Sequence, residues 1–456
     1  MKSMSLKEIA TAVGGRYYGD AALLTQCVTG VTIDSRKIEQ GYLFVAIKGE
    51  RVDGHTFIPA VMEKGALCAL SEQPLENAAH PYILVESCKQ ALKDLAEHYR
   101  KALDIKVVGI TGSVGKTSTK EMIASVLSQK YNVLKTAGNF NNEIGLPLTI
   151  FNINDEHEVA VLEMGISDFG EMHRLTKMAR PDVCVITNIG LCHLENLGSR
   201  DGILKAKTEM FDYMQTDAKI ILNGDDDKLI TIKEVKGITP KFFGLSENLN
   251  AFADDIVSLS LKGTACNIHL GGDSFNTIIP IPGHHMVYNA LAGALVGQEF
   301  GLTPDEIKAG IEALVPVSGR NNLIETDSLM IIDDCYNANP VSTKASLDVL
   351  SLADSRKVAV LGDMFELGEN ETQLHFEVGA HAAQKNIDLV ICIGTLSANT
   401  ARGAENTGAK VMHFEKKDDF LAQAKNVLNK GDAVLVKASN GMAFSEIVEK
   451  LKQLKL

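Results

Sequence analysis

The sequence predicts an α/β protein of three domains: a small N-terminal α/β domain, a central domain with a mainly parallel sheet, and a C-terminal Rossmann-like domain. Two observations support this fold class. The chain has 456 residues, and at about 150 residues per domain this length favours three domains. Beyond residue 105, short apolar runs alternate with helical patterns in two separate series, which is typical of parallel sheets covered by helices.

The first part of the chain has the pattern of a small α/β module. A helical pattern lies at residues 6–13, and the strand-like run 43–47 is followed by glycine-containing turns. A second helical pattern covers residues 87–103 and leads into a different kind of sequence. We therefore expect the first domain to span residues 1–84.

Two series of apolar runs indicate the other two domains. The first series predicts strands at residues 107–110, 159–162, 183–186 and 220–222. The second series predicts strands at residues 329–332, 358–361, 389–393 and 433–436. We expect a central domain over residues 85–318 and a C-terminal Rossmann-like domain over residues 319–456.

The composition argues against nucleic acid as a partner. The formal net charge is −13, aromatic residues make up 5% of the chain, and tryptophan is absent. A negative protein repels a polyphosphate backbone, and few aromatic side chains are present to stack on bases. Any phosphate ligand must therefore be held by a local site.

Cysteine spacing and hydropathy indicate the compartment. The eight cysteines contain no C-x-x-C pair, so we expect most of them to be buried apolar residues and not metal or redox ligands. The N-terminus lacks the apolar core of a secretory signal, and no apolar run approaches the roughly 20 residues of a membrane span. We expect a cytoplasmic protein with no membrane insertion.

A glycine-rich segment follows the first strand of the central series. Residues 111–118 read TGSVGKTS and lead into a helical pattern. This order of strand, loop and helix is typical of a phosphate-binding P-loop, although Ile110 replaces the first glycine of the usual pattern. Lys116 would supply a charge and Thr117 a magnesium ligand. The candidate nucleotide-binding residues of this loop are Gly112, Ser113, Gly115, Lys116, Thr117 and Ser118.

Magnesium bound at this loop would also need carboxylate ligands. The apolar run 159–162 ends in Glu163, at the point where a parallel strand meets its crevice. Glu163 is therefore the first candidate for a carboxylate ligand. The run 183–186 leads into a loop with His193, but a single loop histidine does not by itself indicate a metal site.

Segments along nearly the whole chain resemble the Mur ligases. They lie at residues 34–36, 48–55, 111–117, 138–147, 163–165, 192–195, 205–209, 283–285, 319–320, 334–340 and 362–368. GNFNNEIGLP (138–147), YNANP (336–340) and GDMFELG (362–368) are most similar to the D-alanyl-D-alanine-adding type. The resemblance implies an N-terminal domain for a UDP-muramoyl substrate, a central P-loop ATPase domain, and a C-terminal domain that closes over the nucleotide.

The resemblance also implies roles for single residues. Catalytic roles fall to Lys116, His193 and Lys207, and Lys207 would carry a carbamate. Two Mg²⁺ ions would be held by Thr117, Glu163, His193 and Lys207. Asn289 would contact adenine, and Arg320 and Asp334 would reach the ribose and phosphates. The substrate-binding candidates are Ser35, Arg36, Asn139, Asn141 and Asn142.

The reaction implied by the resemblance is an ATP-dependent amide ligation. D-alanyl-D-alanine would be joined to UDP-N-acetylmuramoyl-tripeptide through an acyl phosphate, giving the UDP-muramoyl-pentapeptide precursor of peptidoglycan. The expected partners are these two small-molecule substrates, and the chain would act as a monomer. The third peptide residue could be lysine or diaminopimelate.

Three positions depart from the family pattern. Met286 follows His285 where the family often has asparagine, and residues 437–440 read KASN where the pattern is KGSR. Lys205 lies two residues before Lys207 and is a second candidate for the modified lysine. We prefer Lys207 because its spacing from His193 and the following Glu209 fit the family better.

Three other functions remain as alternatives. A ligase that adds the third amino acid ranks second and not first, because the D-N-P-R segment common in that type is absent from this chain. A folylpolyglutamate-type ligase ranks third. A P-loop nucleotide switch belongs to a different class. Residues 429–432 match the guanine-reading pattern N-K-x-D, but they precede a strand where that pattern should follow one, so we interpret them as a surface turn.

Overall fold

The structure is a computed structural model that describes residues 1–75, 80–406 and 409–456. Within these residues the chain forms two compact units. The first contains residues 1–111, 130–185 and 207–220, and the second contains residues 112–129, 186–206 and 221–456. The α/β fold class is confirmed, whereas the domain bounds 1–84, 85–318 and 319–456 stay a prediction.

The first unit begins with a five-stranded sheet in the order β2-β7-β6-β5-β4. Its strands are β2 (Arg16–Tyr18), β4 (Gly30–Thr32), β5 (Tyr42–Val45), β6 (Cys68–Ser71) and β7 (Tyr82–Leu84). All neighbours are parallel except β2, which pairs antiparallel with β7. Helix α1 (Leu6–Ala12) starts with a capping box between Ser5 and Glu8, and α2 (Ile58–Glu63) packs its Ile58 and Val61 on Phe44. The helix predicted at 6–13 is confirmed, and the strand predicted at 43–47 is present but covers Tyr42–Val45.

A long helix connects this sheet to the strand before the P-loop. Helix α3 (Cys88–Lys101) is capped by the Ser87 side chain and buries Leu92, Leu95 and Tyr99 on one face, as helical spacing requires. The next strands are β8 (Lys106–Thr111), β9 (Val133–Lys135), β10 (Val159–Glu163) and β11 (Val183–Ile186), and β8 and β9 both pair parallel with β10. Helices α5 (Gly145–Phe151) and α6 (Glu171–Ala179) pack on α3.

The second unit begins with the helix that follows the P-loop. Helix α4 (Lys116–Leu127) packs on α9 (His285–Glu299) and α10 (Pro304–Glu312). A Cβ atom at Gly310 would lie 2.4 Å from Val126 Cα, so only glycine permits this close approach of α10 to α4. This packing brings the start of α9 near the P-loop.

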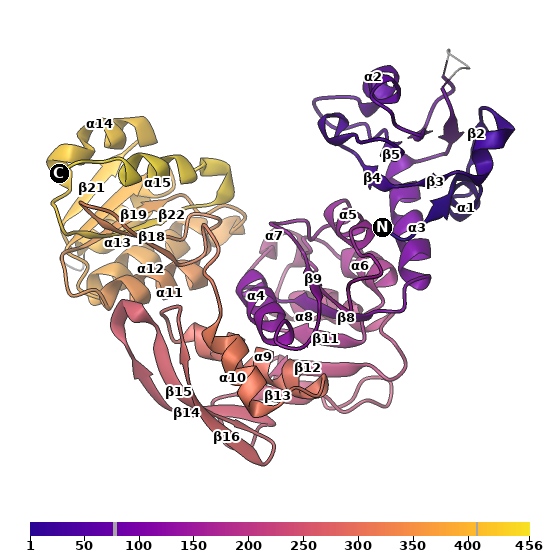
Figure 1. Ribbon diagram of the computed structural model, residues 1–456. Coiled ribbons are helices and arrows are strands. Elements are labelled where there is room, and N and C mark those ends of the chain that lie inside the picture. The colour runs from indigo at the N-terminus through magenta and orange to yellow at the C-terminus, as the bar shows by residue number, and fades with distance from the viewer. Residues whose placement is uncertain (76–79, 407–408) are drawn as a thin grey trace. The chain divides into compact units, whose positions relative to one another are not determined.

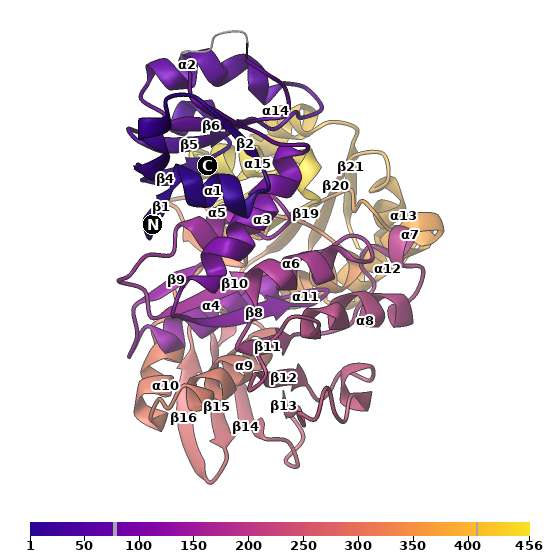
Figure 2. The ribbon, with the colours of Figure 1, turned by 90° about the vertical axis from the view of Figure 1, so that its right-hand side faces the viewer.

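Five further strands follow along the chain, and the last three of them form an antiparallel extension. These strands are β12 (Lys219–Asn223), β13 (Lys241–Gly244), β14 (Ala251–Ser258), β15 (Thr264–Leu270) and β16 (Asp273–Ile279). The first three are parallel, and β14, β15 and β16 pair antiparallel. Figures 1 and 2 show β14 to β16 beside α9 and α10, in agreement with their packing. The three antiparallel strands were not predicted from the sequence.

The C-terminal part of the second unit is a sheet covered on both faces. Its order is β17-β18-β22-β19-β20-β21, and all neighbours are parallel except β17 and β18. The strands are β17 (Asn322–Glu325), β18 (Met330–Asp333), β19 (Lys357–Gly362), β20 (Leu389–Ile393), β21 (Val411–Phe414) and β22 (Ala433–Lys437). The helices are α11 (Pro340–Ser351), α12 (Glu371–Gln384), α13 (Ala398–Asn406), α14 (Lys417–Val427) and α15 (Ser445–Lys452).

Two apolar cores lie on the two faces of this sheet. One core contains α14 and α15 side chains such as Phe420 and Ile447, and the other contains α11 and α12 side chains such as Leu347 and Val378. Figure 1 shows the corresponding helices on opposite sides of the strands. Helices on both faces of a mostly parallel sheet define a doubly wound fold, so the predicted Rossmann-like architecture is confirmed.

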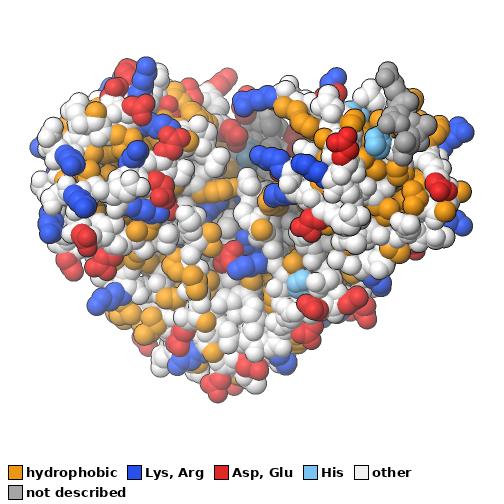
Figure 3. Space-filling view, turned by 45° about the horizontal axis from the view of Figure 1, so that its top comes forward, with side chains coloured by type: hydrophobic (Ala, Val, Ile, Leu, Met, Phe, Trp, Pro, Cys, Tyr) orange, Lys and Arg blue, Asp and Glu red, His pale blue; other side chains and the backbone are white. Residues whose placement is uncertain are grey.

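The burial of the cysteines and the distribution of surface charge agree with the expectations from composition. Six of the eight cysteines are buried, and Cys27 and Cys192 are not. On the face seen in Figure 3, acidic and basic side chains are interspersed, which fits a protein without a general basic field. Among the described residues, no helix has the length and apolar character needed to cross a lipid bilayer.

Candidate active site

Two glycines shape the P-loop. Gly115 has φ +84° and precedes α4, whose first turn has no side-chain cap, so backbone N–H groups at this helix end are available to an anion. Gly112 lies against Thr187: a Cβ atom there would be 1.9 Å from Thr187 Oγ1. Lys116 folds over the loop and its Nζ donates to the Gly112 carbonyl at 2.9 Å. The loop therefore has the backbone and the charge that phosphate binding requires.

Residues after β11 hold the loop in place. Asn188 Oδ1 accepts from Val114 N at 3.0 Å, and Asn188 Nδ2 donates to Val114 O at 2.9 Å. Thr187 Oγ1 donates to the same carbonyl at 2.7 Å, and Gly190 N donates to Ser113 Oγ at 2.9 Å. These contacts were not predicted, although polar residues at the carboxyl end of a second parallel strand were the available signal.

We expect Gly112→Ala to weaken ADP binding by about tenfold, because the new methyl group must displace Thr187 and with it one hydrogen bond to the loop. ADP titration by calorimetry measures the effect. Gly272→Ala is the matched control, since nothing lies within 4 Å of a Cβ atom at Gly272. An unchanged ADP affinity in Gly112→Ala would contradict the assigned role of this glycine.

A cavity of about 350 Å³ opens beside the P-loop within the second unit. Its lining includes Gly115, Ser118, Asn289, Arg320 and Asp334, which are five of the predicted nucleotide residues. The volume lies within the usual range for small-molecule sites. The structure therefore brings residues that are far apart in the sequence to one cavity.

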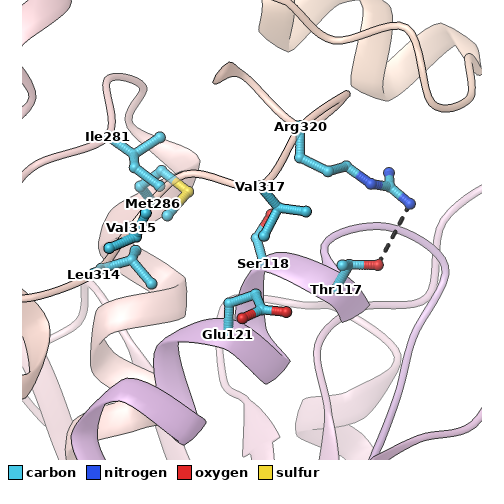
Figure 4. A pocket seen from close by; sticks show the side chains of 9 residues that line it. All are labelled: Thr117, Ser118, Glu121, Ile281, Met286, Leu314, Val315, Val317 and Arg320. Atoms are coloured by element: carbon cyan, nitrogen blue, oxygen red, sulfur yellow. Dashed lines mark hydrogen bonds between the residues drawn. The ribbon is translucent and has the colours of Figure 1, made fainter. Parts of the chain in front are cut away.

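Arg320 reaches the loop from the C-terminal part of the chain. Its Nη2 donates to Thr117 Oγ1 at 3.4 Å, and Figure 4 shows this contact next to Ser118 and Val317. The guanidinium carbon lies 4.0 Å from the centre of the Tyr336 ring, and this stacking restricts the orientation of the cation. Arg320 is thus positioned to meet negative charge at the start of α4.

Asp334 is held in the cavity by buried partners. Its Oδ2 accepts from Ser346 Oγ at 2.5 Å and pairs with Lys437 Nζ at 2.5 Å, while Oδ1 accepts from Asn321 N at 3.2 Å. Burial lowers the pKa of Lys437, and the Asp334 carboxylate opposes this shift. The contacts of Ser346 and Lys437 with this carboxylate could not be inferred from sequence spacing.

Asn289 also lines this cavity. Its Oδ1 accepts from Thr119 Oγ1 at 2.9 Å, and its Nδ2 donates to Met286 Sδ at 3.2 Å. Met286 is the residue that replaces the family asparagine, and its thioether is buried against the amide. Both ends of the Asn289 amide are therefore engaged within the protein, and its contact with adenine stays a prediction.

The second departure from the family pattern also has a visible structural role. Asn440 Nδ2 donates to the Tyr336 carbonyl at 3.0 Å, and Asn440 N donates to Asn337 Oδ1 at 3.3 Å. Asn440 thus fixes the loop that carries Tyr336, the ring on which Arg320 stacks.

His193 is not among the residues that line the nucleotide cavity. It precedes α7 (Leu194–Leu197), has φ +50°, and its Nδ1 lies 3.0 Å from Glu366 Oε2. The described residues contain no group of three or more His, Cys, Asp or Glu side chains arranged to hold a metal. The metal contact of His193 stays a prediction.

The other two metal candidates belong to the first unit. Glu163 is 2% exposed at the end of β10, and its Oε1 accepts from Asn141 Nδ2 at 2.8 Å. Lys207 in α8 (Arg200–Thr208) is 1% exposed, whereas Lys205 is exposed. Asn141 and Glu163 are thus in contact, and the two lysines differ in exposure: Lys207 is buried and Lys205 is not.

The substrate candidates of the first unit have different environments. Arg36 pairs with Asp34 at 2.8 Å and lowers the pKa of Asp34 to about 2. Arg36 borders a cavity of about 650 Å³, and the neighbouring Ser35 offers its carbonyl to Lys64 Nζ at 3.3 Å. This cavity is large enough for part of a nucleotide sugar.

Two asparagines of the 138–147 segment differ in their surroundings. Asn142 Oδ1 accepts from Ile144 N and Gly145 N at 3.1 and 2.9 Å, so its side chain binds backbone N–H groups just before and at the start of α5. Asn139 is exposed. Asn142 thus has a local structural role, and its contact with substrate stays a prediction.

The guanine-reading pattern at residues 429–432 forms a turn. Asp432 is buried, its Oδ2 accepts from Asn429 N at 2.8 Å, and it pairs with Arg356 at 3.0 Å. The carboxylate is directed into the protein, so it is not available to a guanine base. The interpretation as a turn is confirmed.

Family models match three successive parts of the chain. They are described as Mur ligase family, catalytic domain (residues 27–100), Mur ligase middle domain (110–297), and Mur ligase, glutamate ligase domain (319–440). The UDP-N-acetylmuramoyl-tripeptide--D-alanyl-D-alanine ligase of Bacillus subtilis is 41% identical, with 99% of each chain covered. The chain belongs to the Mur ligase family.

Other members of the Mur ligase family agree with this assignment. The Escherichia coli ligase of the same name is 34% identical over 99% of each chain. The crystal structure of MurF from Acinetobacter baumannii superimposes with a TM-score of 0.92 at 30% identity, covering all of both chains. MurF from Thermotoga maritima in complex with ADP gives a TM-score of 0.81 at 33% identity, over 93% of this chain and 97% of that one.

Proposed function

We propose that this chain is an ATP-dependent ligase that joins D-alanyl-D-alanine to UDP-N-acetylmuramoyl-tripeptide. The reaction forms one amide bond and yields ADP and inorganic phosphate. The observation that carries the proposal is the cavity beside the P-loop, bordered by Arg320 and Asp334, in a chain whose full-length relatives have this ligase name. We place the protein in the cytoplasm, acting as a monomer.

The chemistry requires activation of a carboxylate. A carboxylate and an amine do not form an amide in water without it, so the γ-phosphoryl group is first transferred to the tripeptide carboxylate. The amine of D-alanyl-D-alanine then attacks the acyl phosphate, and phosphate leaves. Lys116 and Arg320 lie at the start of α4, where their charges would stabilise the phosphoryl group in transfer.

Two Mg²⁺ ions complete the proposed site. Magnesium prefers oxygen ligands, and the Thr117 hydroxyl, the buried Glu163 carboxylate and a carbamate on Lys207 would supply them, with His193 on the second ion. When bound, the ions neutralise charge on the phosphates. The donor set available in this chain fits that role.

The test is nucleotide turnover with defined substrates. We expect phosphate release from ATP only when UDP-muramoyl tripeptide and D-alanyl-D-alanine are both present, with GTP a poor replacement. A P-loop switch would instead hydrolyse GTP slowly without either substrate. Tripeptides that end in lysine or in diaminopimelate, assayed side by side, identify the third residue.

The alternative within the family is tested with the shorter substrate. A ligase that adds the third amino acid would join a free diamino acid to UDP-muramoyl dipeptide. We expect no reaction with this pair, and a preference for it over tripeptide and D-alanyl-D-alanine would overturn the proposal.

We expect Glu163→Gln to raise the Mg²⁺ concentration needed for half-maximal ligation by about tenfold or more, because a neutral amide is a poorer ligand for a hard cation. Added Mg²⁺ should restore part of the rate. Glu156→Gln removes an exposed acid of the same type and should change nothing. An unchanged Mg²⁺ dependence in Glu163→Gln would exclude this residue as a ligand.

A further inference from the structure

One buried oxygen at the nucleotide cavity has no partner in the protein. Asn321 borders the cavity and is 9% exposed, and its Oδ1 is buried without a hydrogen-bond partner. Buried polar atoms are nearly always hydrogen-bonded, because an unmet hydrogen bond is unfavourable away from water. The carboxamide oxygen is therefore a candidate for a contact with a bound ligand.

The orientation of this carboxamide is fixed. Asn321 Nδ2 donates to His285 Nε2 at 3.2 Å, and the backbone N–H is bound by Asp334. A Cβ atom at Gly283 would lie 2.5 Å from His285 Cε1, so the imidazole is confined by close packing. Asn321 also has φ +47°, a conformation that asparagine tolerates better than most residues.

The neutral form of His285 is compatible with the orientation of the amide in the structure. Desolvation lowers the pKa of His285, so the ring is neutral at neutral pH and Nε2 can accept a hydrogen bond when the proton is on Nδ1. Asn321 Nδ2 lies on the histidine side, and because an amide NH₂ group can only donate, Nε2 is the acceptor of this hydrogen bond. The acceptor Oδ1 is then directed away from the ring.

Asn321 differs in this respect from the other asparagines of the cavity. The cavity is lined by Asn188, Asn223, Asn289 and Asn321. Asn188 and Asn289 use both ends of the amide on protein atoms. Asn223 Nδ2 donates to Thr187 O, and its Oδ1 accepts from Asp225 N. Asn321 alone among these four has an oxygen with no protein partner.

We propose that Asn321 is a nucleotide-specificity residue whose Oδ1 accepts a hydrogen bond from the nucleoside. Phosphate oxygens are acceptors and cannot serve this carbonyl oxygen. The donor is therefore a ribose hydroxyl or the exocyclic amine of adenine. The inference rests on the proposed use of ATP and adds a recognition contact beyond Asn289, Arg320 and Asp334.

The experiment compares ADP with three analogues on two matched variants. The analogues are 2′-deoxy-ADP, 3′-deoxy-ADP and the purine riboside diphosphate that lacks the 6-amine. Asn321→Gly removes the carboxamide and suits the positive φ. Asn386→Gly is the control, since Asn386 is exposed and has φ +54°. Calorimetry gives the affinities, and circular dichroism checks folding.

We expect Asn321→Gly to bind ADP about five- to tenfold more weakly than the wild type. For the wild type, one of the three analogues should bind more weakly than ADP by a similar factor. For Asn321→Gly, that same analogue should bind as tightly as ADP. The group that this analogue lacks is then the hydrogen-bond donor. Asn386→Gly should match the wild type. Unchanged ADP affinity in Asn321→Gly, or analogue penalties that all persist in it, would overturn the inference. A wild-type protein that binds no ADP would instead overturn the proposed function.

Discussion

Lys116→Ala is expected to lower the ligation rate by about 100- to 1,000-fold, the usual loss when a group that stabilises developing charge is removed. Lys116 is the first residue of α4, and its Nζ already lies over the loop at the Gly112 carbonyl. Backbone N–H groups would still bind phosphate, so nucleotide affinity should fall less than the rate. Phosphate release with both substrates, together with ADP titration, separates the two effects.

The fold should survive this change, because one hydrogen bond to a loop carbonyl contributes only about 1 kcal/mol. Lys130→Ala removes the same charge from an exposed position and should keep normal turnover. If Lys116→Ala also ligates at a near-normal rate, residues 111–118 are not the catalytic phosphate loop.

Lys207→Ala is expected to inactivate the enzyme by about 100-fold or more, and a short carboxylic acid such as formate should restore part of the rate. An ammonium group near Mg²⁺ would be repelled, whereas a carbamate offers oxygen ligands. The side chain is 1% exposed, which is rare for a lysine on a helix that has only a surface role.

Lys205→Ala is the matched control, because Lys205 lies on the same helix and is exposed. It should remain active without added acid. A carbamate carbon signal after ¹³C-bicarbonate labelling should be present in the wild type and in Lys205→Ala, and absent in Lys207→Ala. If Lys205 is the essential, acid-rescued residue, the assignment is off by two positions. If neither variant is rescued and no signal is found, the carbamate is excluded.

Some of the fold escaped prediction even though a signal was present. In β15, Thr264, Cys266, Ile268 and Leu270 are buried, which is the period-two pattern of a strand with one face in the core. Polar Thr264, Asn267 and His269 interrupt the run, so it lacks the continuous apolar character of the parallel strands. Those strands were found because both of their faces are buried.

The sequence by itself determined the features that depend on neighbours along the chain. These are the parallel strands, the P-loop at residues 111–118, and Glu163 at the end of its strand, because a strand followed by glycines and a helix has few alternative conformations. Family resemblance predicted that Asn289, Arg320 and Asp334 bind the nucleotide. The structure shows that all three line one cavity.

Only the tertiary structure decided how residues from distant segments share their hydrogen bonds. Asn188 holds the P-loop, Met286 engages Asn289, and Lys437 with Ser346 fixes Asp334. Asparagine occurs at many positions along this chain, and no local pattern separates the oxygen of Asn321 from the others. A buried polar group forms hydrogen bonds with the side chains that lie within about 3 Å of it. Which side chains these are depends on the packing of the whole core and not on the local sequence.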